Sequence, residues 1–228
     1  MREVVFDTET TGLDPKTGDR MVEIGCVEMV NLVPTGETFH AYYNPERDMP
    51  AGAEAVHGLS SAFLADKPLF RDGAEALMEF LGDAPLVAHN ASFDFGFLDK
   101  ELEIIGREPV PRDRMVDTVA LARKRHPGAK LSLDALCSRY GIDRSHRVKH
   151  GALLDAELLA QVYVELTGGR QIGLALATEE PEDNAVAIEA FRPQTGPFRE
   201  PRPHAATAAE LSRHRSFVQT LDSPLWTR

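Results

Sequence analysis

VVFDTETTG, residues 4–12, reads as an apolar strand that ends in two acidic residues and a turn. Residues of a β-strand alternate between the two faces of a sheet, so Asp7 and Glu9 should project to the same side. Two carboxylates held together repel each other unless a cation lies between them, and Mg²⁺ prefers oxygen ligands. The stretch therefore predicts a divalent-cation site on a sheet. Acidic residues near a turn are also common as solvated residues, so this interpretation depends on partners elsewhere in the chain.

Length and composition limit the class of protein. The 228 residues, 43% of them hydrophobic, suggest one compact domain of about 170 residues with an appendage. Cys26 and Cys137 lie in apolar surroundings, which favours buried thiols in a cytoplasmic protein over a disulfide. No signal peptide precedes the first strand, and no apolar run reaches the length of about 18 residues that spans a membrane. The net charge of −11 argues against nucleic-acid binding by phosphate neutralisation alone.

The segments after the first strand predict an antiparallel meander followed by parallel strands. The further strands are expected at residues 21–32, 38–43, 86–88 and 115–117. The turn between the second and third strands is expected at Pro34-Thr35-Gly36. A helix with an apolar stripe begins at Phe70 and precedes the strand at 86–88, so that strand should run parallel to the first.

Two further acidic residues are candidates to join the first pair. We expect Asn90 to cap a helix that carries Asp94 in its first turn. This helix leaves the carboxyl end of a strand, where ligands bind in open sheets, although an acidic residue there also suits the helix dipole. His150 and Asp155 would diverge by about 140° within one helix. His150 should therefore lie on the loop before the helix that holds Asp155.

Basic residues precede His150 in the sequence. Arg139, Arg144, Arg147 and Lys149 form a basic approach to this histidine, and residues 123–126 form a second basic cluster. Either cluster could also be an ordinary solvated face. A helix is expected between a cap at Ser132 and Gly141.

Together these residues suggest hydrolysis of a phosphodiester. Four carboxylates and a histidine are typical of two-metal chemistry, in which cations activate water and neutralise the scissile phosphate. Ligation by carboxylates alone favours Mg²⁺ or Mn²⁺ over zinc. A histidine can accept the proton of the attacking water near neutral pH. The candidate metal ligands are Asp7, Glu9, Asp94 and Asp155, and the candidate base is His150.

Three motifs resemble those of the DEDDh 3′–5′ exonucleases. They are DTETTG at 7–12, HNAxFD at 89–94 and HGAxxD at 150–155, in the order and spacing of that family, and SLDALC at 132–137 adds to the similarity. The resemblance covers residues 2–169. It implies an α/β, ribonuclease H-like fold with a five-stranded mixed sheet flanked by helices. It also implies removal of mismatched 3′-terminal nucleotides from single-stranded DNA ends, as proofreading for a bacterial replicative DNA polymerase.

The family pattern assigns roles to individual residues. Asp7 would bridge two metal ions, Glu9 and Asp155 would hold the ion on the nucleophile side, and His150 would be the general base. Asp94 would act on the second ion, directly or through water. The implied contacts to the terminal nucleotide are Thr10, Gly12, Leu13, His57, Asn90 and Phe93. A mismatched end reaches such a site readily, because less energy is needed to unpair it.

The residues after 169 differ in composition from the rest. We expect an exonuclease domain over 1–169, a flexible linker over 170–204, and a helical, apolar segment over 205–228. Residues 171–176 resemble a sliding-clamp-binding peptide, with Gln171, Leu174 and Leu176 as contacts, although a linker with apolar residues would look similar. The resemblance implies that the last segment binds the polymerase catalytic subunit, and its alternative is to fold back on the exonuclease domain. A small accessory subunit is a further candidate partner.

Two rival functions share these features. A stand-alone relative could trim RNA or short oligonucleotides, but it would not need the linker and the apolar terminus. A structural adaptor that joins polymerase to clamp could have lost catalysis, yet all the residues needed for the chemistry are in place.

Overall fold

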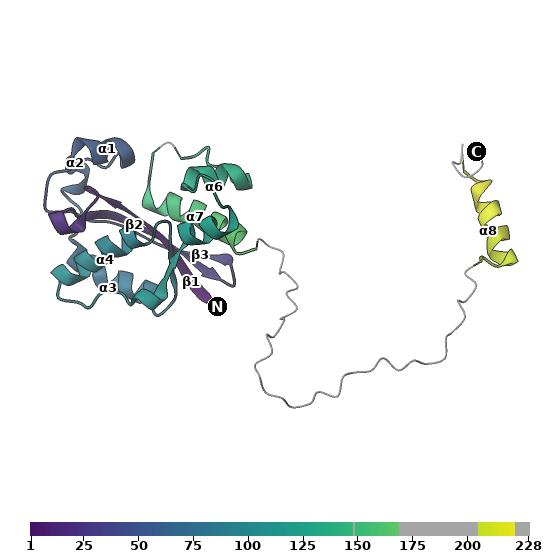
Figure 1. Cartoon of the computed structure of the whole chain (residues 1–228), viewed down its shortest axis with the longest axis horizontal. Helices are drawn as coiled ribbons and strands as arrows, with labels where there is room; N and C mark the ends of the chain where they lie inside the picture. Colours follow the sequence, from purple (N-terminus) through teal and green to yellow (C-terminus); the bar gives the residue numbers. More distant parts are fainter. Residues whose placement is uncertain (148, 169–204, 222–228) are drawn as a thin grey trace, which may run out of the picture. The chain divides into compact units, whose positions relative to one another are not determined.

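The computed structural model describes residues 1–147, 149–168 and 205–221. The part before residue 169 is built on a five-stranded mixed sheet of order β3-β2-β1-β4-β5. Figure 1 shows β1, β2 and β3 of this sheet with the helices that flank it. The strands are β1 (Arg2–Thr10), β2 (Met21–Val30), β3 (Val33–Tyr42), β4 (Leu86–Ala88) and β5 (Met115–Asp117). The first three strands are antiparallel neighbours, whereas β4 is parallel to both β1 and β5. This is the mixed sheet that the sequence predicts.

Helices cover both faces of the sheet. The helical elements are η1 (Pro15–Thr17), α1 (Ala51–His57), α2 (Ser61–Leu64), α3 (Phe70–Leu81), α4 (Ser92–Ile104), η2 (Arg112–Arg114), α5 (Thr118–Arg125), α6 (Leu133–Tyr140) and α7 (Ala152–Leu166). Val4 and Phe6 pack with α3 and α4 on one face, and Val5 packs with α7 on the other. Because strand residues alternate, Asp7 and Glu9 must share the face of Val5, toward α7.

A glycine lets α7 lie directly on the sheet. Gly25 of β2 is the partner of Asp7 in the antiparallel register. A Cβ atom at Gly25 would lie 2.2 Å from the backbone nitrogen of Leu153 and 2.4 Å from the carbonyl carbon of Ala152. No real Cβ atom is that close to backbone, so only glycine allows the first turn of α7 to sit beside Asp7.

The predicted turn between the second and third strands is wrong. The turn consists of Asn31 and Leu32, whose φ angles are 51° and 64°. Two positive φ angles in a two-residue loop are typical of the hairpins that match strand twist. The expected turn at residues 34–36 is instead part of β3, an edge strand that tolerates proline.

Most other predicted elements are confirmed. The stripe of α3, Phe70, Ala74, Leu77 and Leu81, is fully buried. The side chain of Ser132 caps α6 by accepting a hydrogen bond from the amide of Ala135. Cys26 and Cys137 are free, buried thiols, as expected.

The C-terminal described segment is helical, as predicted. Helix α8 (Ala208–Val218) begins with a capping box in which Thr207 and Glu210 satisfy each other's backbone amides. It exposes large apolar side chains, including Leu211 and Phe217. The candidate clamp contacts Gln171, Leu174 and Leu176 lie outside the described residues, as does the rest of 169–204. Among the described helices, none has both the length and the apolar character needed to cross a membrane.

Candidate active site

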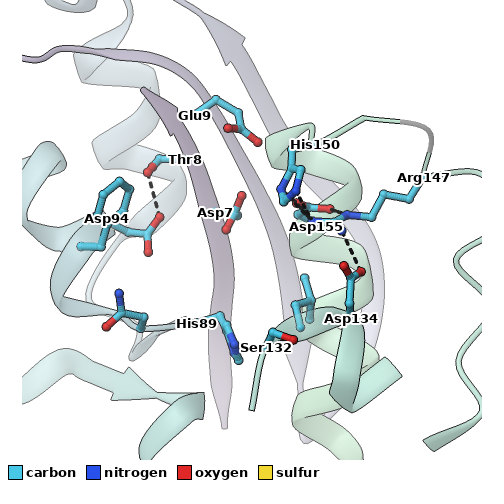
Figure 2. A pocket seen from close by; sticks show the side chains of 13 residues that line it. Asp7, Thr8, Glu9, His89, Asp94, Ser132, Asp134, Arg147, His150 and Asp155 are labelled. Atoms are coloured by element: carbon cyan, nitrogen blue, oxygen red, sulfur yellow. Dashed lines mark hydrogen bonds and ion pairs between the residues drawn. The ribbon is translucent and has the colours of Figure 1, made fainter. Parts of the chain in front are cut away.

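The predicted catalytic residues line one pocket at the carboxyl end of β1. This pocket has a volume of about 260 Å³ and is lined by Asp7, Glu9, Asp94, His150 and Asp155, among others. Figure 2 shows Asp7 in the middle, with Asp94 on one side and Asp155 on the other. Residues more than 140 positions apart in the sequence thus reach the same small space. Their placement agrees with the expected site, while their chemical roles stay a prediction.

Asp94 is held in place by a neighbour on β1. Thr8 lies between Asp7 and Glu9 and therefore points to the opposite face, toward α4. Its hydroxyl donates a hydrogen bond of 2.7 Å to Oδ1 of Asp94, and both side chains are buried. As predicted, Asp94 lies in the first turn of the helix that follows β4. The hydroxyl of Thr8 fixes the direction in which this carboxylate faces the pocket.

Asn90 is not the N-cap of α4, so that prediction is wrong. Asn90 has a φ of 63°, and the residue before the helix is Ala91, whose side chain makes no cap. Instead Oδ1 of Asp117 accepts hydrogen bonds from the amides of Asn90 at 3.1 Å and Ala91 at 3.4 Å. Asp117 ends the neighbouring parallel strand β5, and this cross-strand pairing leaves no signal in local spacing. Asn90 still lines the pocket.

His150 lies on the loop before α7, as the spacing predicts. Its side chain is 47% exposed, and its Nδ1 lies 3.2 Å from Oδ2 of Asp155, which is almost fully buried in the first turn of α7. The backbone amide of His150 donates a long hydrogen bond of 3.4 Å to the carbonyl of Val56 in α1. The histidine is thus attached to the site yet open to solvent.

Burial, together with nearby carboxylates, disfavours the charged forms of the acids in the site. Burial, followed by the charges of Asp94 and Glu9, raises the pKa of Asp7 well above its usual value. Burial and the charge of Glu23 raise the pKa of Glu9 to about 8. Burial also raises the pKa of Asp94 to about 7, although the hydrogen bond from Thr8 opposes this rise. Such a concentration of negative charge is relieved when a cation binds.

The donor atoms suit a hard divalent cation. Ligand atoms of Glu9, His150 and Asp155 all lie within 4.8 Å of one another. Asp7 and Asp94 line the same pocket and add carboxylate oxygens, the ligand type that Mg²⁺ and Mn²⁺ prefer. The residues present therefore fit such an ion.

Arg147 is a site residue whose carboxylate partners the sequence does not indicate. The sequence predicts it either as part of a basic approach to His150 or as part of a solvated face, and its side chain, only 9% exposed, is not solvated. Its Nη2 donates a hydrogen bond of 2.6 Å to Oδ2 of Asp155, and its Nη1 donates one of 2.8 Å to Oδ1 of Asp134. The same Nη2 lies 2.8 Å from Nδ1 of His150 (Figure 2). Nothing in the spacing of these residues indicated a shared network.

The second predicted basic cluster is partly structural. Arg125 donates a hydrogen bond of 3.1 Å to the carbonyl of Leu166 at the end of α7. Nε2 of His126 lies 2.6 Å from the hydroxyl of Tyr140 in α6. These two side chains tie α5 to its neighbours, so they are not simply a solvated face.

A larger, more apolar pocket adjoins the carboxylates. Its volume is about 510 Å³, and five of the six predicted nucleotide contacts line it: Thr10, Gly12, Leu13, His57 and Phe93. The two pockets share Thr8, Glu9 and Phe93. His57 is buried, which lowers its pKa, and its Nδ1 accepts a hydrogen bond from the amide of Leu59. Its Nε2 has no hydrogen-bond partner within the described part of the chain.

Comparison with known proteins identifies the class. The sequence matches the profile of the protein family described as "Exonuclease" over residues 4–163. DNA polymerase III subunit epsilon of Rickettsia felis is 46% identical over 224 residues, which are 97% of each chain. The Escherichia coli subunit of that name is 46% identical over 186 residues, covering 78% of this chain and 76% of its own. The chain belongs to the DEDDh family of 3′–5′ exonucleases, as its three motifs predict.

Solved structures confirm the ribonuclease H-like fold. Exonuclease X in complex with 5′ overhanging duplex DNA is 27% identical, with a TM-score of 0.57 over 72% of this chain and 90% of that one. The nuclease domain of 3′hExo, a DEDDh family member bound to rAMP, has a TM-score of 0.64 over 73% of this chain and 91% of its own. At 16% identity, the second likeness concerns the fold alone.

Proposed function

We propose that this exonuclease proofreads DNA within bacterial DNA polymerase III, where it removes mismatched nucleotides from the 3′ end of the growing strand. One observation carries the proposal: the carboxylate pocket and the apolar pocket meet at Thr8, Glu9 and Phe93. A terminal nucleoside in the apolar pocket would place its phosphate at the carboxylates. The 46% identity to epsilon subunits over nearly the whole chain supports the replicase setting.

The apolar pocket suits a nucleoside without reading its base. Its volume of about 510 Å³ lies in the range of small-molecule sites. Leu13 and Val56, which line this pocket, offer exposed apolar surface. Selectivity needs no base-specific contact, because separating a mismatched 3′ end from its template costs less free energy than separating a paired one.

Two divalent cations, Mg²⁺ or Mn²⁺, would be held by Asp7, Glu9, Asp94 and Asp155. When bound, such ions make water more acidic and neutralise the charge of the scissile phosphate. Thr8 keeps Asp94 turned toward the pocket through its 2.7 Å hydrogen bond. Gly25 allows α7 to bring Asp155 close to Asp7.

His150 would accept the proton of the attacking water. It borders the carboxylate pocket, and its Nδ1 lies 3.2 Å from Oδ2 of Asp155, which limits the directions that the imidazole can take. Its 47% exposure lets the proton pass to solvent after each turnover. The position on a loop allows the imidazole to adjust to a bound phosphate.

The C-terminal part would attach the enzyme to the replicase. The exposed apolar side chains of α8, Leu211 and Phe217, suit binding to the catalytic (alpha) subunit. Gln171, Leu174 and Leu176 would bind the sliding clamp (beta), and the exonuclease domain would accept a small accessory subunit. A cytoplasmic location goes with this role.

The test compares three substrates that have the same sequence: DNA with a mismatched 3′ end, fully paired DNA, and RNA. We expect nucleoside 5′-monophosphates to be released fastest from the mismatched DNA. Asp7→Ala should abolish release while leaving binding to the polymerase subunit intact. Faster release from RNA would contradict the proofreading role, and full activity of Asp7→Ala would contradict the metal-site assignment.

A further inference from the structure

We infer that Arg147 competes with a divalent cation for Asp155, and that Asp134 holds the guanidinium once it is displaced. The inference rests on the cation site of the proposed function. It makes Arg147 a positioning residue that sets how tightly the site binds its cation.

The first observation is that Arg147 occupies both oxygens of Asp155. Nε donates to Oδ1 and Nη2 donates to Oδ2, the forked geometry of a strong guanidinium–carboxylate pair. Asp155 also contributes to the group of ligand atoms that lie within 4.8 Å of one another. The carboxylate of Asp155 thus binds the guanidinium of Arg147 and also borders the candidate site for a divalent cation.

The second observation is the burial of this pair. The side chains of Arg147 and Asp155 are only 9% and 3% exposed. Solvent screens their charges poorly, so a guanidinium and a dication at one carboxylate would repel each other strongly. A dication that takes Asp155 must therefore weaken or break its bond to Arg147.

The third observation is that Arg147 already has a second anionic partner. Its Nη1 donates a hydrogen bond of 2.8 Å to Oδ1 of Asp134, in the first turn of α6. The side chain of Asp134 is 47% exposed and can follow a small movement of the guanidinium. On leaving Asp155, Arg147 would keep one charged hydrogen bond instead of becoming a buried, unpaired charge.

A purely structural ion pair makes the opposite prediction. If Arg147 only shaped the site, its removal would disorder Asp155 and weaken cation binding. If Arg147 competes with the cation, its removal tightens cation binding, although the protein without a cation becomes less stable because Asp155 is left unpaired. The direction of the change in affinity therefore separates the two roles.

The experiment measures Mn²⁺ binding to the full-length protein by titration calorimetry. Arg147→Gln should tighten binding by about tenfold, in the range of couplings between two interacting charges. Asp134→Asn should weaken binding by about fivefold, because the displaced guanidinium loses its second partner. When Arg147→Gln is already present, adding Asp134→Asn should not change the Mn²⁺ affinity further, since no Arg147 guanidinium remains for Asp134 to hold.

Arg144 provides the matched control. Its Nη1 lies 2.9 Å from the same oxygen of Asp134, so Arg144→Gln removes an equal charge from the network. Since no hydrogen bond or ion pair joins Arg144 to Asp155 among the described residues, the Mn²⁺ affinity should stay within about twofold. Arg147→Lys keeps the positive charge but cannot donate to both oxygens of Asp155, so it should tighten Mn²⁺ binding by less than Arg147→Gln does. If Arg147→Gln does not fold, Arg147→Lys takes its place in the test.

The outcomes distinguish this inference from the proposed function. Unchanged or weaker Mn²⁺ binding in folded Arg147→Gln, or in Arg147→Lys where that variant replaces it, would overturn the competition while leaving the cation site standing. Wild-type protein that binds no Mn²⁺ would overturn the cation site, and the inference with it.

Discussion

Thr8 and its two acidic neighbours show how one strand supplies three side chains to a site from opposite faces. Asp7 and Glu9 point toward α7, whereas Thr8 reaches Asp94 at the start of α4. The alternation that sets this arrangement follows from strand geometry alone. The face that Asp7 and Glu9 share could therefore be predicted from the sequence, while the contact of Thr8 with Asp94 needed the structure.

Thr8→Val should lower nucleotide release by about tenfold, because Asp94 loses the charge-assisted hydrogen bond that fixes its direction. Thr8→Ser keeps the hydroxyl and should retain most of the activity. The measurement is kcat on single-stranded DNA, with thermal unfolding as a check that both variants fold. Equal losses in the two variants would show that packing of the methyl group, and not the hydroxyl, matters at this position.

The raised pKa values of Glu9 and Asp94 predict how stability depends on pH. Both folded-state values, about 8 and about 7, lie above the ordinary values of 4.5 and 3.8. The folded protein therefore holds these protons more tightly than the unfolded chain. The contribution of these protons to the free energy of unfolding is fully present below about pH 4, and it is lost as the pH rises through about 7 to 8.

Divalent cations should reverse this loss. We expect Mn²⁺ to raise Tm more at pH 8 than at pH 6, because at pH 8 it replaces protons that the carboxylates have given up. Thermal melts with EDTA or with MnCl₂ at both pH values provide the measurement. Glu9→Gln, which removes one of the titrating groups, should narrow the difference. A Tm increase of the same size at both pH values would contradict the prediction.

The contact between β2 and α7 controls the site from outside the pocket. Gly25→Ala would place a Cβ atom 2.2 Å from the backbone of Leu153, and backbone cannot yield as a flexible side chain does. We expect a loss of about 2 kcal/mol in the free energy of unfolding. Activity should fall as well, because Asp155 moves away with α7. Denaturant unfolding and nucleotide release measure the two effects.

Gly96 in α4 is the matched control for this substitution. Among the described residues outside its own helix backbone, a Cβ atom there would meet Cγ of Pro15 at 3.7 Å, which is ordinary contact. Gly96→Ala should leave stability unchanged or raise it slightly, since alanine favours helix over glycine. If Gly25→Ala were as well tolerated as Gly96→Ala, close packing of α7 on the sheet would not be what positions Asp155.

Elements differ in how well the sequence predicts them. The helix from Phe70 to Leu81 was predictable, because four apolar residues at helical spacing all face the core. The hairpin turn was not, because Leu32 gives no signal for a positive φ angle. The network of Arg147 was missed for a similar reason. It joins a loop to two helices, and local periodicity carries no information about such contacts.

The chain as a whole combines an acidic enzyme with a separate terminal helix. The net charge of −11 opposes binding to DNA, so the exonuclease domain should hold a DNA end only weakly by itself. Attachment to a polymerase would compensate for this weak binding, because tethering raises the effective concentration of the enzyme at the primer end. Weak DNA binding would also let the primer return to the polymerase after a mismatch is removed.

Truncation after Gly169 tests whether the C-terminal residues serve attachment and not catalysis. The shortened protein keeps every residue of both pockets. We expect it to degrade saturating single-stranded DNA at a kcat within about twofold of the full chain, since tethering changes effective concentration and not chemistry.

The shortened protein should fail to co-purify with the polymerase catalytic subunit, and it should correct mismatched primers poorly when polymerase is present. Restored correction at high concentrations of the truncated protein would support tethering. If truncation instead abolished activity on free single strands, the terminal residues would have to act in the exonuclease itself.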